Sequence, residues 1–236
     1  MNSNKSILVT FIAIVFGGSG LATAATVTGK ATFSGAAPAA ATIKMTADAV
    51  CMKKHAEGGV KDESVVTGPG GALANVFVYV KSGLEGKSFP APGAPVVFDQ
   101  NGCWYKPHVF GIQTGQPLEI RNSDPTLHNV NFMAKNNPPF NMAMPVQGMK
   151  ITKKFPKPEV MVKIKCNVHP WMSAYVGVLE HPFFGVTAKD GSFSLANLPA
   201  GKYVLEAWHE KYGTSSQEIA VSETETKTVR FSFKPQ

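Results

Sequence analysis

Apolar and polar residues alternate with a period of two through most of this chain, beginning after its first two dozen positions. The alternation is clear at 118–121, 160–165 and 229–233, where residues of one parity are mostly apolar and their neighbours mostly polar. Gly, Pro, Asn or Asp bounds nearly every such run, which is typical of strands joined by turns. The pattern therefore predicts an all-β sandwich, in which each strand turns one face to the core and one to water.

Further strands are predicted at 27–33, at 75–80 and at 95–98, and the turns at 189–191 and 198–201 each lead into another. Only residues 46–55, which precede a Gly-Gly pair, have the pattern of a short helix. We expect four parts in sequence order: a signal peptide at 1–24, an N-terminal β extension at 25–102, a central β domain at 103–180 and a small C-terminal β domain at 181–236.

Composition narrows the class of protein. Only 17% of the 236 residues are charged and 44% are hydrophobic, which excludes a disordered chain or a coiled coil. The net charge is +7, but the basic residues are scattered in ones and twos. Nucleic-acid binding is therefore not expected.

The first residues have the pattern of an export signal. Lys5 precedes the apolar stretch 7–16, and Ala22-Thr23-Ala24 offers a small-residue cleavage site. The apolar stretch is too short to cross a bilayer, so we expect export to the periplasm without stable membrane insertion. An uncleaved anchor is the alternative.

Three cysteines in an oxidising compartment cannot all pair with one another. A bridge between Cys51 and Cys103 is our hypothesis, and its loop would stabilise the fold by about 4 kcal/mol. Cys166 is then left over and needs another role.

Cys166 opens the most informative run of the chain, which reads Cys-Asn-Val-His-Pro-Trp-Met and includes His169 and Met172. Continuing the expected inward set of 160, 162 and 164 by two residues reaches Cys166, so its thiol should face the core. Upstream, His128 shares one face with Val130 and Phe132. Two imidazoles and a thiolate with a weak axial thioether form the ligand set of a type 1 (blue) copper centre.

These motifs resemble those of the cupredoxins. The Cys-x-x-His-x-x-Met spacing is similar to that of the amicyanins, and the run 107–124 followed by His128-Asn129-Val130 resembles the strand, turn and strand before the first histidine ligand. The resemblance covers about 103–180. It implies that His128, Cys166, His169 and Met172 are copper ligands, that Asn129 ties the two ligand loops together, and that the protein transfers electrons instead of catalysing a reaction.

The C-terminal part, 181–236, resembles carboxypeptidase-regulatory-like or carbohydrate-binding-like β modules through its Asp-Gly-Ser-Phe and Leu-Pro-Ala-Gly-Lys-Tyr turns. The first strand, at 26–35, is similar to the opening strand of such modules. In an alternative organisation the copper domain is therefore inserted into a sandwich that both chain ends share.

The leading expectation is a periplasmic electron carrier that docks a redox protein, such as a c-type cytochrome or a dehydrogenase, at an exposed edge near His169. One alternative is a non-redox copper-handling protein that uses a methionine cluster, and another is a glycan or cell-surface binder with a vestigial copper site. A second metal or haem site is a further alternative. The residues involved would be Met133, Met142, Met144 and Met149 for the cluster, and His108, His181 and His209 for the second site.

Overall fold

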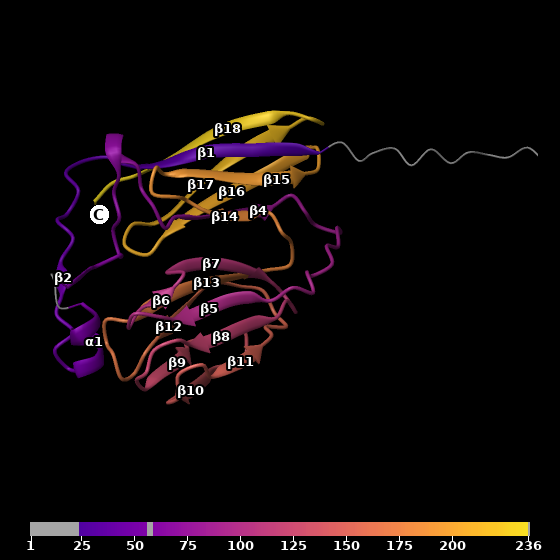
Figure 1. Ribbon diagram of the computed structural model, residues 1–236. Helices are drawn as coiled ribbons and strands as arrows, with labels where there is room; N and C mark the ends of the chain where they lie inside the picture. The colour runs from indigo at the N-terminus through magenta and orange to yellow at the C-terminus, as the bar shows by residue number, and fades with distance from the viewer. Residues whose placement is uncertain (1–23, 56–58, 236) are drawn as a thin grey trace, which may run out of the picture.

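The computed structural model describes residues 24–55 and 59–235. Its strands form two β-sandwiches, one above the other in Figure 1. We call them the end sandwich, built from strands near both ends of the chain, and the middle sandwich. The all-β class expected from the alternating pattern is confirmed.

The end sandwich consists of two sheets that share one core. In the first sheet, the opening strand lies between two late strands, antiparallel to one and parallel to the other. In order across the sheet, these strands are β15 (Ser192–Leu198), β1 (Ala25–Phe33) and β18 (Thr226–Phe233). The second sheet contains β14 (Phe184–Val186), β4 (Phe77–Ser82), β16 (Gly201–His209) and β17 (Gly213–Val221).

The middle sandwich is formed by the chain between β4 and β14. One sheet has the order β10 (Phe140–Met144), β9 (His128–Phe132), β12 (Glu159–Lys165), β13 (Ser173–Leu179) and β7 (Val109–Gln113). The other has the order β11 (Lys150–Lys153), β8 (Leu118–Asn122), β5 (Val96–Gln100) and β6 (Tyr105–Lys106). Phe98, Ile120, Phe132 and Ile164, all fully buried, belong to the core between these sheets.

The sheets divide the chain differently from the expected boundaries at 102 and 180. Strands β1 and β4, from the expected N-terminal extension, pair with late strands, whereas β5 pairs with β8 of the middle sandwich. The middle sandwich is thus an insertion in the end sandwich, which was the alternative organisation. Alternation along a strand shows which face is buried, but it does not show the partner strand.

Two glycines allow the sandwiches to pack closely. Phe77 of β4 packs on Gly177 of β13 and Gly111 of β7. A Cβ at Gly177 would lie 2.5 Å from the Phe77 ring, and one at Gly111 would lie 2.5 Å from the ring of Phe184. Because any side chain there would collide with an aromatic ring, these positions require glycine.

The expected inward set of β12 is wrong at one position. Val160 is 41% exposed, whereas Val162 and Ile164 are buried. The register shifts between Glu159 and Val162, and Met161 has a φ of 59°. This bulge reverses the phase at the start of the strand and turns Met161 towards the aromatic cluster between the sandwiches. Beyond the bulge the expected phase holds as far as Cys166.

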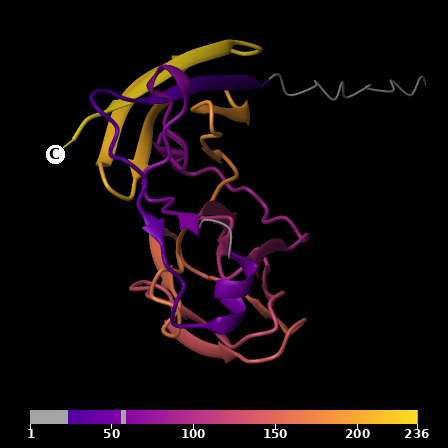
Figure 2. The same ribbon diagram turned by 60° about the vertical axis from the view of Figure 1, so that its left-hand side comes forward.

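A separate segment of the N-terminal part lies against the middle sandwich (Figure 2). It contains the short hairpin of β2 (Thr42–Ile43) and β3 (Val60–Lys61), and between them the helix α1 (Ala49–Lys54). Asp48 is the N-cap of α1, and its side chain accepts hydrogen bonds from the backbone N–H groups of Val50 and Cys51. A 3₁₀ turn at Pro69–Gly71 then precedes β4. The short helix expected at 46–55 is therefore present.

The expected signal peptide, 1–24, lies outside the described residues apart from Ala24. Within the described residues, no helix has both the length and the apolar character needed to cross a membrane.

Candidate metal centre

Three potential donors from two distant stretches of sequence meet at one end of the middle sandwich. His128 begins β9, while Cys166 and His169 lie in the loop between β12 and β13. One ligand atom from each lies within 4.8 Å of the others, and all three side chains are buried. The Nδ1 atoms of the two histidines are 3.0 Å apart, and the Cys166 sulfur is 3.7 Å from Nδ1 of His169.

The loop from Cys166 to Met172 is held closed by its own backbone. The N–H of Cys166 donates to the carbonyl of Met172 at 3.1 Å, and the N–H of Met172 donates to the carbonyl of His169 at 2.9 Å. Met172 is 1% exposed and belongs to the same core cluster as Cys166. The loop therefore turns its thiol and its thioether into the sandwich.

Asn129 connects the two donor stretches. Its Oδ1 accepts the backbone N–H of Asn167 at 3.1 Å, and its Nδ2 donates to Oδ1 of Asn141 at 2.6 Å. The Tyr105 hydroxyl donates to the Asn129 carbonyl at 2.5 Å. Since Asn129 follows His128 and Asn167 follows Cys166, these bonds fix the spacing between the two donors.

The surroundings of the Cys166 thiol lower its pKa. Burial by itself would raise the pKa of this thiol, but hydrogen bonds with the imidazoles of His128 and His169 and with backbone N–H groups outweigh burial and lower it to about 6. The backbone N–H of His169 donates to the sulfur at 3.3 Å. A lowered pKa favours the thiolate, which is the form that binds metal.

Asp124 lies behind His128, with its Oδ2 2.9 Å from Nε2 of the ring. This carboxylate also accepts the backbone N–H groups of Gly102 and Cys103, and Lys54 of α1 forms an ion pair with it at 2.5 Å. Burial alone would raise the pKa of Asp124, but the contacts with His128, Lys54 and the two N–H groups hold it well below its usual range. The ionised carboxylate accepts the Nε2–H of His128, which leaves Nδ1 facing the other donors.

Asp48 lies behind His169 in the same way. Its Oδ2 is 3.2 Å from Nε2 of that ring and accepts the Thr126 hydroxyl at 2.8 Å. Burial alone would raise the pKa of Asp48, but the Cys51 N–H, the Thr126 hydroxyl and His169 lower it to about 2. Both imidazoles therefore have a carboxylate on the nitrogen that points away from Cys166.

A disulfide closes the outer side of the centre. Cys51 and Cys103 are bonded to each other, and the Cys51 sulfur lies 3.8 Å from Nε2 of His169. The Trp171 indole N–H donates to the Cys103 carbonyl at 3.1 Å, and its ring packs against the His169 ring with centroids 5.0 Å apart. Two other combinations of nearby donors, Asp48 with Cys51 and Asp124 with Cys103, contain the bonded cysteines, so we do not treat them as metal sites.

The His169 ring itself is not part of an exposed edge. Its side chain is 1% exposed, because Asp48, the disulfide and Trp171 cover it. The exposed apolar groups nearest in sequence to the histidines are Leu127 and Val168, at 41% and 42% exposure.

Sequence reasoning missed the contribution of α1. Asp48, Cys51 and Lys54 follow one another at intervals of three, which places them on one face of a helix. The structure turns that face to the donors, where the three residues contact His169, Cys103 and Asp124 respectively. The i, i+3, i+6 spacing of these residues was the sequence signal that could have indicated this role of α1. Asp124, four residues before His128, was a second one.

The other histidines are bonded to neighbouring protein groups. His108 contacts the Ser173 carbonyl and the Glu210 carboxylate, and His181 contacts the Val80 carbonyl. His209 stacks on Tyr212, and burial lowers the pKa of its ring to about 4. No group of three metal-ligating side chains found among residues 24–55 and 59–235 includes any of these histidines.

The four methionines of the alternative copper-handling cluster lie in different surroundings. Met144 is fully buried, and its sulfur accepts a hydrogen bond from Gln100 Nε2 at 3.0 Å. Met149 packs against the core, Met142 lies half-buried on β10, and Met133 is 47% exposed. Met144 and Met149 thus serve as core residues.

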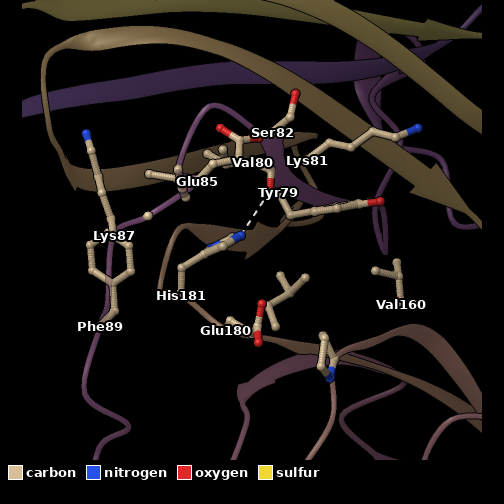
Figure 3. A pocket seen from close by; sticks show the side chains of 14 residues that line it. Tyr79, Val80, Lys81, Ser82, Glu85, Lys87, Phe89, Val160, Glu180 and His181 are labelled. Atoms are coloured by element: carbon tan, nitrogen blue, oxygen red, sulfur yellow. Dashed lines mark hydrogen bonds between the residues drawn. The ribbon is translucent and has the colours of Figure 1, made fainter.

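A cavity of about 390 Å³ lies where the two sandwiches meet, and Figure 3 shows its lining. Lys81 and Lys87 line it together with Glu85 and Glu180, so both signs of charge are present. His181 points into this region, but its Nε2 is bonded to the Val80 carbonyl at 2.9 Å. None of the donors described above lines this cavity.

The donor set fits a copper ion. Copper in a type 1 centre takes two imidazoles, a thiolate and a weak thioether. The structure gathers His128, Cys166 and His169, and Met172 shares a core cluster with Cys166. Each imidazole has an outer carboxylate, an arrangement common behind metal-binding histidines.

A scan against models of protein families and a search of curated proteins gave no match. Among solved structures, the chain is similar to a Cu-containing nitrite reductase from Thermus scotoductus SA-01, with 24% identity and a TM-score of 0.35 over 40% of this chain and 24% of that one. It is also similar to a purple cupredoxin from Nitrosopumilus maritimus, with 22% identity and a TM-score of 0.30 over 36% and 98% of the two chains. For the Cu(I) form of a mutant amicyanin the identity is 21% and the TM-score 0.32, over 43% and 97%.

These similarities concern the fold alone, and the chain spans about a quarter of the length of the nitrite reductase. The fold of the chain is all-β, as the alternating pattern predicted, and the resemblance of 103–180 to the cupredoxins stays a prediction. The resemblance of 181–236 to carboxypeptidase-regulatory-like modules stays a prediction.

Proposed function

We propose that this protein is a type 1 copper protein that transfers single electrons between redox partners. The observation that carries the proposal is the convergence of His128, Cys166 and His169 within 4.8 Å of one another. Copper bound there would accept and release one electron. The protein residues would supply a thiolate, two oriented imidazoles and a stiff surrounding sheet.

Rigidity suits this role, because electron transfer is fast when the ligands move little between two oxidation states. Asn129 links the two donor stretches, and the backbone closes the loop 166–172. Burial of the donors keeps water away from the thiolate, which also limits its oxidation. We assign no catalytic step to the site.

As the docking surface we propose the exposed Leu127 and Val168, each next to a histidine of the centre in sequence. The partner would be a periplasmic redox protein such as a c-type cytochrome or a dehydrogenase, and the signal-like residues 1–24 support export to that compartment. A net charge of +7 would speed encounter with an acidic partner in a salt-dependent way.

A non-redox copper-binding role is the second candidate, favoured by one observation. Asp48 and the disulfide cover His169. Such a cover suits retention of the metal better than rapid exchange of electrons through that ring.

The two roles are separated by the spectrum of the copper-loaded protein. We expect an intense visible thiolate-to-Cu(II) band, a small copper hyperfine splitting in electron paramagnetic resonance and a reversible one-electron wave in voltammetry. The band should vanish in Cys166→Ser and persist in His108→Gln, which alters a buried imidazole outside the centre. A colourless Cu(II) complex would overturn the electron-transfer proposal and favour copper handling.

A further inference from the structure

The two carboxylate oxygens of Asp48 have different partners. Oδ1 accepts the backbone N–H groups of Val50 at 2.8 Å and Cys51 at 3.0 Å, which caps α1. Oδ2 accepts the Thr126 hydroxyl at 2.8 Å and lies 3.2 Å from Nε2 of His169. A helix cap needs only the first of these oxygens, so the second is available to orient the imidazole.

A carboxylate beside Nε2 favours the tautomer of His169 that has its proton there. The Nδ1 lone pair then points to the side where the Cys166 sulfur lies 3.7 Å away and Nδ1 of His128 lies 3.0 Å away. Asp124 has the same relation to His128. Asp124 comes from the loop just before β9, whereas Asp48 comes from a segment that is remote in sequence.

That remote segment is firmly attached to the middle sandwich. One turn after Asp48, Cys51 is bonded to Cys103, and one turn further Lys54 forms an ion pair with Asp124 at 2.5 Å. The attachments place the Asp48 carboxylate on His169 with only 17% of its side chain exposed. Its charge is thus held close to the donors in a poorly hydrated place.

We propose that Asp48 is a positioning residue of the copper site, which orients His169 and lowers the reduction potential of the bound metal. The inference rests on the proposed copper function and adds α1 and its disulfide to the centre. A nearby negative charge stabilises Cu(II) more than Cu(I), and a hydrogen bond to carboxylate makes the imidazole a stronger donor. Both effects favour the oxidised ion.

The test is Asp48→Asn, which retains a side-chain oxygen for the helix cap but replaces the oxygen that faces His169 with an amino group. The amino group cannot accept the Nε2–H. We expect Cu(II) affinity to fall by about tenfold to a hundredfold, with a smaller change for Cu(I). If the difference between the two ions is tenfold, the potential rises by about 59 mV.

Asp190→Asn is the matched control, because it removes the same charge from an exposed turn of the end sandwich. It should leave the potential unchanged. Asp48→Ser is a second test variant, since serine also caps helices but is shorter by one atom and has no second oxygen for His169. Asp48→Glu keeps the carboxylate and should retain more of the wild-type potential than Asp48→Asn does.

A second readout uses the metal-free protein. Nitrogen-15 chemical shifts should show the proton of His169 on Nε2 in the wild type and a shift towards Nδ1 in Asp48→Asn. A purely structural role would lower the unfolding midpoint of the variant and leave the tautomer and the potential of its folded form unchanged, which would overturn the proposal. If the wild type forms no thiolate-to-copper band, the proposed function fails, while the tautomer still tests whether Asp48 orients the ring.

Discussion

Nδ1 of His128 lies 3.0 Å from Nδ1 of His169, although the two residues are 41 positions apart in the chain. Each ring has its other nitrogen on a carboxylate, Asp124 for His128 and Asp48 for His169. The rings therefore present their inner nitrogens to one place, one from the start of β9 and one from the loop between β12 and β13. A metal ion held between them would depend on both stretches of sequence at once.

Removal of one inner nitrogen should accordingly abolish tight binding. For His128→Gln we expect a loss of Cu(II) affinity greater than about 100-fold, more than the loss of an outer hydrogen-bond partner causes. Competition with a copper chelator measures it. His181→Gln is the control, since His181 is bonded to the Val80 carbonyl and lies outside the donor group. Equal affinities of the two variants would contradict the assignment of His128.

The disulfide should contribute to stability through the loop that it closes, which joins residues 52 positions apart. Replacement of both Cys51 and Cys103 by serine is expected to lower the free energy of unfolding by about 4 kcal/mol on the chain-entropy argument. Urea titration of the metal-free protein measures this. The same variant should release copper to a chelator faster, because α1 loses one of its attachments. An unchanged release rate would show that Lys54 and Asp48 hold the helix by themselves.

Glu206 should make the end sandwich sensitive to acid. This buried carboxylate accepts the Tyr79 hydroxyl and the Lys81 ammonium, both at 2.5 Å, and the Ser216 hydroxyl at 2.9 Å. Burial alone would raise its pKa, but these bonds lower it below the ordinary value of 4.5. Because the folded pKa is the lower one, the stabilisation is present above pH 4.5 and is lost as the pH falls below it.

Glu206→Gln should therefore lower the free energy of unfolding by about 1–3 kcal/mol at pH 7 and by less at pH 3. Urea titration at both values tests the difference. The exposed Glu218 of the neighbouring strand provides the control as Glu218→Gln. A loss at pH 3 as large as the loss at pH 7 would indicate a packing effect instead of a charge effect.

Phe77 should couple the two sandwiches. Its ring is fully buried against Gly111 and Gly177, and it also stacks with Phe184. Phe77→Ala is expected to lower stability by about 3–5 kcal/mol. In a calorimetric scan, the variant should show two transitions if the sandwiches then unfold separately. A single transition at an unchanged temperature would contradict the coupling.

Local patterns of residues predicted much of this architecture. Alternation identified β8, β12 and β18, and the helix pattern at 46–55 contained α1. The exception, Val160, follows from a bulge at Met161, where a non-glycine residue adopts a φ of 59°. Period-two alternation alone does not predict a β-bulge, because the extra residue of the bulge depends on packing against the other sandwich.

Pairing between distant residues was harder to predict. The run Cys-x-x-His-x-x-Met and the upstream His128 indicated the donors, whose convergence the structure shows, while the metal itself stays a prediction. The cover over His169 was missed because it depends on where a six-residue helix docks. Likewise, the sequence pattern did not show that β1 and β18 pair in parallel, because these strands lie near opposite ends of the chain, with Thr26 opposite Thr226.

This last pairing has a consequence for synthesis. Apart from its bridge to Ala72, β1 has no partner strand until β15 and β18 have been made, whereas every strand of the middle sandwich is available once residue 179 has emerged. The middle sandwich can therefore fold while the end sandwich is still incomplete. A chain that stops near residue 190 would keep the donors but leave both edges of β1 open, where other chains can add as strands.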